Sequence, residues 1–272
     1  MTWTLIEPFA GSAAFTFHML AAPSPLVPYQ GNKWKLRHML APIAMDLGFQ
    51  RWPSRVVLND LGPWAVTLDV LTHHDRRQLM IRHVGRMAAE DPREVFDRLQ
   101  GAQVPESPVL YAAEHLVLER IAFSGKAVGE IDARWRSPGF NATSAYGTEA
   151  TSRFRAINPQ IPALLKRLKQ WRIVPADIQV KRQDARELHQ DIDVRGPTLV
   201  YLDPHYEGTT GYPHGTAGTM EGSLAEAHAW AAKGAHVILS ERKGTVHLPA
   251  MGNDGSPFRI RRTEGLTILG PK

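Results

Sequence analysis

Two short segments that lie far apart in the chain share one pattern. In each, an apolar run is followed by an acid, a proline and an aromatic residue. They are TLVYLDPHY at residues 198–206 and TLIEPFAGSAAF at residues 4–15. Buried parallel strands have such continuous apolar runs, and open α/β sheets bind ligands at the carboxyl ends of their strands. The two segments therefore predict one site on one edge of a single sheet.

The DPHY segment contains the groups that chemistry on an aromatic amine requires. The exocyclic amine of adenine is a weak nucleophile because its lone pair is delocalised into the ring. A carboxylate and a backbone carbonyl can together accept its N–H groups, and an aromatic ring can stack on a base rotated out of the duplex. Asp203, the carbonyl of Pro204 and the ring of Tyr206 would supply these parts. With a methyl sulfonium held in line with the nitrogen, catalysis would be mainly positioning.

The turn after residue 7 is suited to a nucleoside ligand that has no phosphates. Its small residues, Ala10 and Gly11 among them, allow close approach to the backbone at a helix N-terminus. It is neither GxGxxG nor GxxxxGK[ST], so it lacks the phosphate-binding lysine. Asp60 ends the next strand, VVLND, where an acid typically accepts ribose hydroxyls. A helix N-cap or a loop acid is the alternative for Asp60. Asp184 could bind an adenine amino group, with a turn aspartate as the alternative.

The composition of the chain excludes several kinds of site. The 272 residues include no cysteine, which excludes disulfide scaffolds, thiol catalysis and cysteine-ligated metal sites. The adjacent His73 and His74 lack the i, i+4 spacing of a metal-binding pair, and no metal site is expected. The N-terminus has no basic leader, and no apolar run approaches the length of a membrane span. We expect a cytoplasmic protein with no membrane partner.

Positive charge is concentrated in the middle of the chain. The formal net charge of the whole chain is +5, whereas residues 120–172 contain ten Lys and Arg against three acids, a net charge of +7. Six Phe, Trp and Tyr residues are interleaved with them between residues 123 and 171. Localised positive charge with aromatic residues predicts a nucleic-acid surface. A solvated basic face is the alternative.

The order of elements predicts a doubly wound α/β sheet, because strands alternate with helices at both ends of the chain. Strands are expected at residues 3–9, 56–60, 178–184, 199–203 and 236–241, with a terminal hairpin of residues 258–263 and 266–269. Helices are expected at residues 12–20, 32–47, 64–71, 75–99, 109–121, 161–171 and 224–233, with loops and a hairpin in 123–151. The middle of the chain lacks this alternation of strands and helices. Residues 73–175 are therefore interpreted as an insertion into a discontinuous domain of residues 1–72 and 176–272.

Taken together, the motifs resemble the Dam-like family of adenine-specific DNA methyltransferases, which use S-adenosylmethionine. The family's DPPY, (D/E)PFxGxG-like, PYxGGK-type and FN…(F/Y)G motifs are similar to DPHY at 203–206, EPFAGSAA at 7–14, PYQGNK at 28–33 and GFNATSAYG at 139–147. Two departures stand out. The PYQGNK segment follows the PF-G motif instead of preceding it, which suggests a local permutation. His205 replaces a proline, where it is either tolerated or adds a hydrogen bond or a titrating group.

The resemblance implies a Rossmann-like methyltransferase sheet with an inserted, mainly helical DNA-recognition domain. It implies transfer of a methyl group from S-adenosylmethionine to the N6 amino group of a flipped adenine in double-stranded DNA. The implied cofactor-binding residues are Glu7, Pro8, Phe9, Ala10, Gly11, Tyr29, Lys33, Asp60 and Asp184. The implied catalytic residues are Asp203, Pro204, His205 and Tyr206. The implied DNA-binding residues are Lys126, Arg134, Arg136, Asn141 and Tyr146.

The same residues also allow other functions. The same fold could methylate RNA or single-stranded DNA, and a catalytically silent DNA-binding paralogue would keep the same surface. A dinucleotide-dependent oxidoreductase is disfavoured because no GxGxxG is present. Restriction-modification, regulation and phage DNA modification are the alternative roles of such an enzyme.

Overall fold

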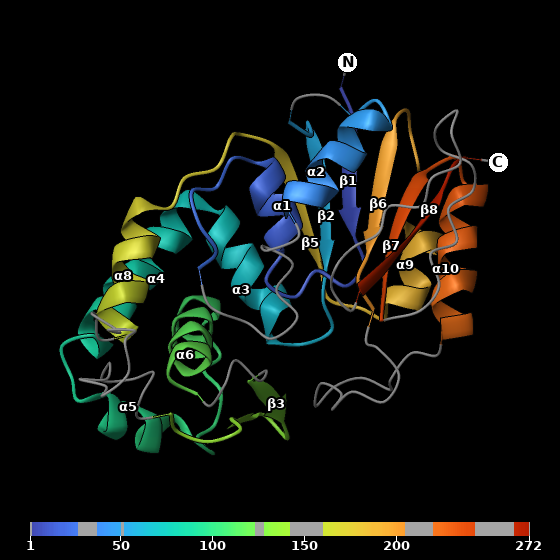
Figure 1. The fold of residues 1–272 in the computed structure, drawn as a ribbon. Helices are drawn as coiled ribbons and strands as arrows, with labels where there is room; N and C mark the ends of the chain where they lie inside the picture. The colour runs from blue at the N-terminus through green and yellow to red at the C-terminus, as the bar shows by residue number, and fades with distance from the viewer. Residues whose placement is uncertain are drawn as a thin grey trace, which may run out of the picture.

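The computed structural model describes residues 2–26, 37–49, 52–122, 128–141, 160–204, 220–242 and 264–271. It is an α/β fold in which a mainly parallel sheet lies beside a mainly helical region (Figure 1). Within these described ranges, no helix combines the length and the apolar character needed to span a membrane. The cytoplasmic location stays a prediction from the sequence.

Six strands in the described part of the chain form the sheet, in the order β5-β2-β1-β6-β7-β8. They are β1 (Thr4–Glu7), β2 (Arg55–Asn59), β5 (Asp177–Lys181), β6 (Thr198–Leu202), β7 (His236–Arg242) and β8 (Glu264–Leu269). All neighbours are parallel except β7 and β8. The chain moves outward from β1 to β2 and β5, and then crosses to β6 on the other side of β1. This reversal makes the carboxyl ends of β1 and β6 the topological switch point, where α/β sheets bind ligands.

Helices bury both faces of the sheet, and successive side chains of a strand point to opposite faces. Leu5 belongs to a core beneath α1 (Ala14–Met19), α2 (Arg37–Asp46) and α3 (Pro63–Thr72). Its neighbour Ile6 belongs to a second core beneath α9 (Ala185–Asp191) and α10 (Met220–Ala232). The doubly wound sheet expected from the sequence is confirmed at the level of a parallel α/β sheet covered by helices.

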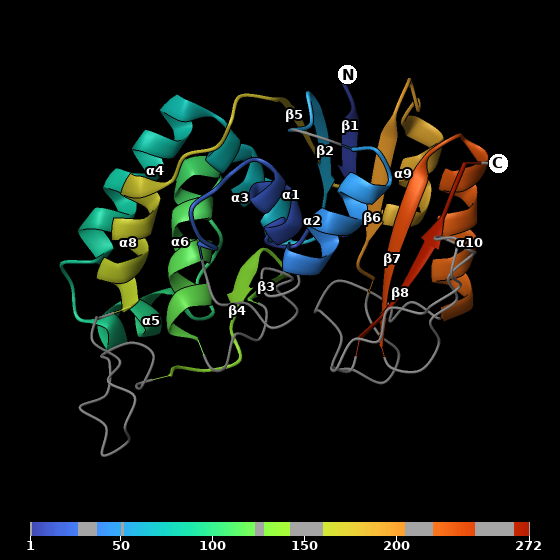
Figure 2. The same ribbon diagram turned by 45° about the horizontal axis from the view of Figure 1, so that its top comes forward.

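The mainly helical region consists of four helices and a short hairpin within the described residues. They are α4 (His74–Met87), α5 (Pro92–Leu99), α6 (Pro108–Ile121), α8 (Gln160–Gln170), β3 (Gly129–Ile131) and β4 (Arg134–Arg136). Helices α4, α6 and α8 pack side by side (Figure 2). Met80, Leu116 and Leu164 belong to the same hydrophobic cluster as Leu5 of the sheet. The core is therefore continuous between the two regions, and the domain boundaries stay a prediction.

The expected hairpin in the middle segment is confirmed by β3 and β4. Asp132 and Ala133 connect the two strands, with positive φ angles of 51° and 54°. Two consecutive left-handed residues give the two-residue turn whose twist matches that of paired strands.

Two expectations about elements were wrong. The single helix expected at residues 75–99 is interrupted, because Asp91 caps a new helix and accepts hydrogen bonds from the N–H groups of Arg93 and Glu94. The terminal hairpin was expected to turn at residues 264–265, but both residues belong to β8, which pairs antiparallel with β7. Pairing with β7 satisfies the backbone groups of an otherwise open sheet edge. Residues 258–263 lie outside the described ranges.

Candidate functional site

The strand registers bring the ends of both motif segments to one edge of the sheet. Ile6 pairs with Val200 and Glu7 pairs with Leu58, so β1, β2 and β6 end near one another. Asp60 and Asp203 follow directly after the last residues of β2 and β6. The carboxyl groups of Glu7 and Asp203 are close enough to interact electrostatically. The arrangement gathers three acids at the switch point, each delivered by a different strand.

Glu7 is directed into the protein, and the residue is 2% exposed. Its Oε1 accepts a hydrogen bond from the backbone N–H of Thr16 at 2.7 Å and another from the Thr16 hydroxyl at 2.8 Å. Burial raises the pKa of Glu7 to about 8, the two Thr16 contacts oppose the rise, and the charge of Asp203 adds to it. Glu7 therefore anchors the first turn of α1 as a neutral acid near pH 7, and contact with a cofactor stays a prediction.

Asp60 connects the turn after β1 to the start of α3. Its Oδ2 accepts from the N–H of Gly11 at 3.1 Å, and its Oδ1 accepts from the N–H of Gly62 at 2.7 Å. Gly11 has φ of 47°, a left-handed conformation that favours glycine. Burial raises the pKa of the Asp60 carboxyl, while the two N–H groups lower it. Because a carboxylate offers about four lone-pair sites, this half-buried group keeps capacity to accept two hydroxyls.

Asn59 is the important residue of this edge that the sequence reasoning missed. Its side chain is buried and donates to the carbonyl of Pro8 at 2.9 Å and to that of Gln183 at 3.0 Å. Its Oδ1 accepts from the N–H of Gln183 at 3.2 Å, and its own carbonyl accepts from Ala10. Asn59 thus joins the loops after β1, β2 and β5. The available signal was a polar residue that ends a buried apolar strand beside an acid.

We expect Asn59→Leu to lower the free energy of unfolding by about 2 kcal/mol, because buried backbone groups of two loops lose their partners. Urea denaturation followed by circular dichroism measures the change. Gln179→Ala is the matched control, since it removes an exposed side-chain contact with Arg55 from the neighbouring strand β5. Its effect should stay within about 0.5 kcal/mol. Equal midpoints for the Leu variant and the wild type would show that the three loops do not depend on Asn59.

Asp184 has a local structural role in addition to its predicted one. Its Oδ1 accepts from the N–H of Arg186 at 3.0 Å and so caps α9. The Arg186 guanidinium also pairs with the carboxylate and holds the pKa of Asp184 below its usual range. These contacts match the alternative of a turn aspartate, and a role toward adenine stays a prediction.

The other predicted cofactor and catalytic residues divide between described and undescribed segments. Pro8, Ala10 and Pro204 are buried at the same edge, and Phe9 is half-buried there. The predicted residues that lie outside the described ranges are Tyr29, Lys33, Lys126, Tyr146, His205 and Tyr206.

The predicted DNA-binding residues in the described ranges lie on or after the hairpin. Arg134 and Arg136 are exposed on β4, whereas Asn141 is half-buried and donates its N–H to the carbonyl of Ile121. Part of the sequence pattern was misleading, because Trp135 and Trp171 are core residues. These large rings fill the helical region instead of presenting a stacking surface.

Arg120, which was counted in the basic segment, is 8% exposed. Burial lowers the pKa of its guanidinium to about 10, and the nearby Arg167 lowers it further. Arg120 therefore belongs to the packing of α6 and not to an open basic surface.

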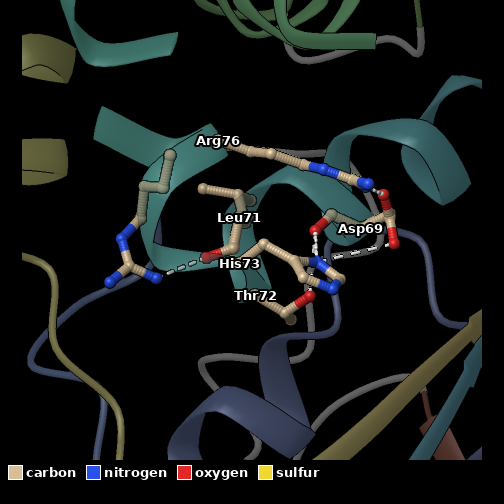
Figure 3. A network of polar contacts seen from close by, with 6 residues as sticks. Asp69, Leu71, Thr72, His73 and Arg76 are labelled. Atoms are coloured by element: carbon tan, nitrogen blue, oxygen red, sulfur yellow. Dashed lines mark hydrogen bonds and ion pairs between the residues drawn. The ribbon is translucent and has the colours of Figure 1, made fainter. Parts of the chain in front are cut away.

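The His73 and His74 pair lies at the corner between α3 and α4. The His73 Nδ1 is 2.6 Å from the carbonyl oxygen of Asp69, and Arg76 donates to the Asp69 carboxylate at 2.5 Å (Figure 3). These contacts fix the helix corner. Within the ranges that the structure describes, no group of three or more His, Asp or Glu residues is arranged to hold a metal ion.

A cavity of about 290 Å³ lies beside this corner, lined by His73, Arg77 and residues 173–178. The lining includes Asp177, the first residue of β5. The cavity is therefore at the amino ends of the strands, opposite the edge that carries Asp60 and Asp203.

Comparison of the chain with protein-family models gives no match, and comparison with curated proteins gives no significant match. The functional interpretation therefore depends on the residues of the site and on the motifs that they form.

Proposed function

We propose that the protein is an S-adenosylmethionine-dependent methyltransferase of the α/β type. Its proposed reaction is methylation of the N6 amino group of adenine in double-stranded DNA at a specific sequence. One observation carries the proposal: Glu7, Asp60 and Asp203 meet at the carboxyl edge where the strand order reverses. Glu7 and Asp203 belong to the two motif segments that resemble the methyltransferase family, and Asp60 follows the strand beside β1.

The described residues fit the cofactor in their chemistry. Asp60 retains acceptor capacity for the two ribose hydroxyls after binding the N–H groups of Gly11 and Gly62. The small residues after Phe9 would admit the methionine end, and Tyr29 and Lys33 would contact it as the resemblance implies. When bound, the cofactor supplies a methyl group on a positively charged sulfur. No phosphate-binding sequence is required, and none is present in the turn.

The acceptor groups follow β6. The carboxylate of Asp203 and the carbonyl oxygen of Pro204 would each accept one N–H of the adenine amino group. These two hydrogen bonds favour a pyramidal nitrogen and direct its lone pair toward the methyl group. Tyr206 would stack on the flipped base. Because β6 is buried throughout, Asp203 has a rigid support, which suits a reaction that depends on positioning.

Exposed arginines on the hairpin support a DNA substrate. Arg134 and Arg136 alternate with the buried Trp135, so the core residue fixes the strand while both cations face solvent. Contacts between such cations and phosphates make DNA affinity fall steeply with salt.

The test is transfer of tritium from labelled S-adenosylmethionine to double-stranded DNA, single-stranded DNA and RNA. Modified-base sequencing of DNA from cells that express the protein should find N6-methyladenine in one fixed sequence context. Transfer to RNA or single-stranded DNA alone would correct the substrate class. Retention of duplex DNA without transfer to any substrate would favour the catalytically silent paralogue.

A further inference from the structure

An ion pair connects the hairpin to the loop that follows β5. Arg182, the residue after β5, donates from Nη2 to Oε2 of Glu130 on β3 at 3.0 Å. The phenol of Tyr111 on α6 donates to the same carboxylate oxygen at 2.7 Å. Tyr111 is 4% exposed, so it holds the carboxylate from a fixed position.

The other end of this connection reaches the edge that carries Asp60. Arg182 also donates from Nε to the carbonyl oxygen of Leu61 at 3.3 Å. Leu61 follows Asp60, and the Arg182 and Asp60 charges interact. One guanidinium from the loop after β5 therefore contacts both the hairpin and the loop after β2.

The hairpin itself is firmly packed, so Glu130 is not an isolated surface acid. It pairs in the ladder with Trp135, whose ring nitrogen donates to Glu114 at 2.7 Å. The Trp135 and Tyr111 rings lie 4.6 Å apart, centroid to centroid. A displacement of Glu130 would therefore also displace Arg134 and Arg136 on β4.

We propose that Glu130 and Arg182 are positioning residues that join the hairpin and the Asp60 edge into one unit, so that duplex DNA and cofactor strengthen each other's binding. This inference rests on the proposed function. The ligand that binds first orders the shared unit, and the second then loses less conformational entropy on binding. Solvent screens the ion pair mainly on its Arg182 side, since the Arg182 and Glu130 side chains are 45% and 20% exposed.

The first experiment measures the affinity for S-adenosylhomocysteine by calorimetry, with and without saturating duplex DNA, on the full chain. In the wild type, DNA should raise this affinity about 5-fold or more, within the usual range of coupling between sites. In Glu130→Ala and Arg182→Gln the gain should fall below about 2-fold, with Tyr111→Phe in between. Asp193→Asn is the control, since it breaks an exposed ion pair with Arg195 before β6. Two ligands that bind without coupling in the wild type would overturn the proposal.

The second experiment needs no ligand and uses amide hydrogen exchange. In Glu130→Ala, the N–H groups of Gly11 and Gly62, which donate to Asp60, should exchange several-fold faster together with those of the hairpin. Faster exchange in the hairpin alone would show that the two parts are independent. A protein that binds neither DNA nor the cofactor product would remove the proposed function, whereas the exchange result still decides whether hairpin and edge form one unit.

Discussion

Replacement of Asp203 by Ala is expected to lower the rate of methyl transfer at least about 100-fold, the usual effect of removing a group that stabilises a transition state. The carboxylate would accept one N–H of the target amine, and Ala cannot do so. The affinity for S-adenosylhomocysteine should stay within about two-fold, because Asp203 is assigned to the acceptor and Asp60 to the ribose. Single-turnover tritium transfer and calorimetry measure the two quantities.

Asp193→Ala provides the control for this prediction. It makes the same chemical change on an exposed residue before β6, so activity should be retained. Asp203→Asn tests the need for charge, since an amide of the same size keeps one acceptor oxygen but adds a donor group. Full activity in Asp203→Ala would remove the catalytic assignment of the DPHY segment.

The second large effect concerns Glu7 and the pH dependence of stability. The pKa of Glu7 is raised from 4.5 to about 8, so the folded protein binds this proton more tightly than the unfolded chain. The resulting stabilisation is fully present below pH 4.5 and is lost as the pH rises through about 8. Between about pH 6 and about pH 8, this group alone should lower the free energy of unfolding by about 2 kcal/mol.

Glu7→Gln should remove that slope. The Gln amide has the shape of the protonated acid, and its oxygen can accept both Thr16 hydrogen bonds. We expect the variant to match the wild type below about pH 4.5 and to become the more stable protein as the pH rises from there to about 8. Urea denaturation at several pH values measures the difference, with the exposed Glu187→Gln as control. Parallel stability curves for the Glu7 variant and the wild type would show that Glu7 is ionised in the folded protein.

Much of the sheet could be predicted because its signals are local. Each parallel strand is a short apolar run. An acid in or just after the strand was identified for β1, β2 and β6. The core location of Trp135 and Trp171 could not be predicted in this way. Charge and aromatic content are the same for a nucleic-acid surface and for a helical core with a basic exterior.

The local order of residue types was sufficient to identify the five parallel strands and the acids in or just after β1, β2 and β6, and it suggested the chemistry that these acids could support. It did not reveal that Asn59 joins three loops, that β8 pairs with β7, or that Glu130 holds Arg182. These contacts depend on the order of strands in the sheet and on the packing of the hairpin against it. They join residues as far apart in the chain as Asn59 and Gln183, separated by 124 positions, or Glu130 and Arg182, separated by 52. Hydrogen bonds over such separations form only after the chain has packed, and they leave no periodic pattern in the sequence.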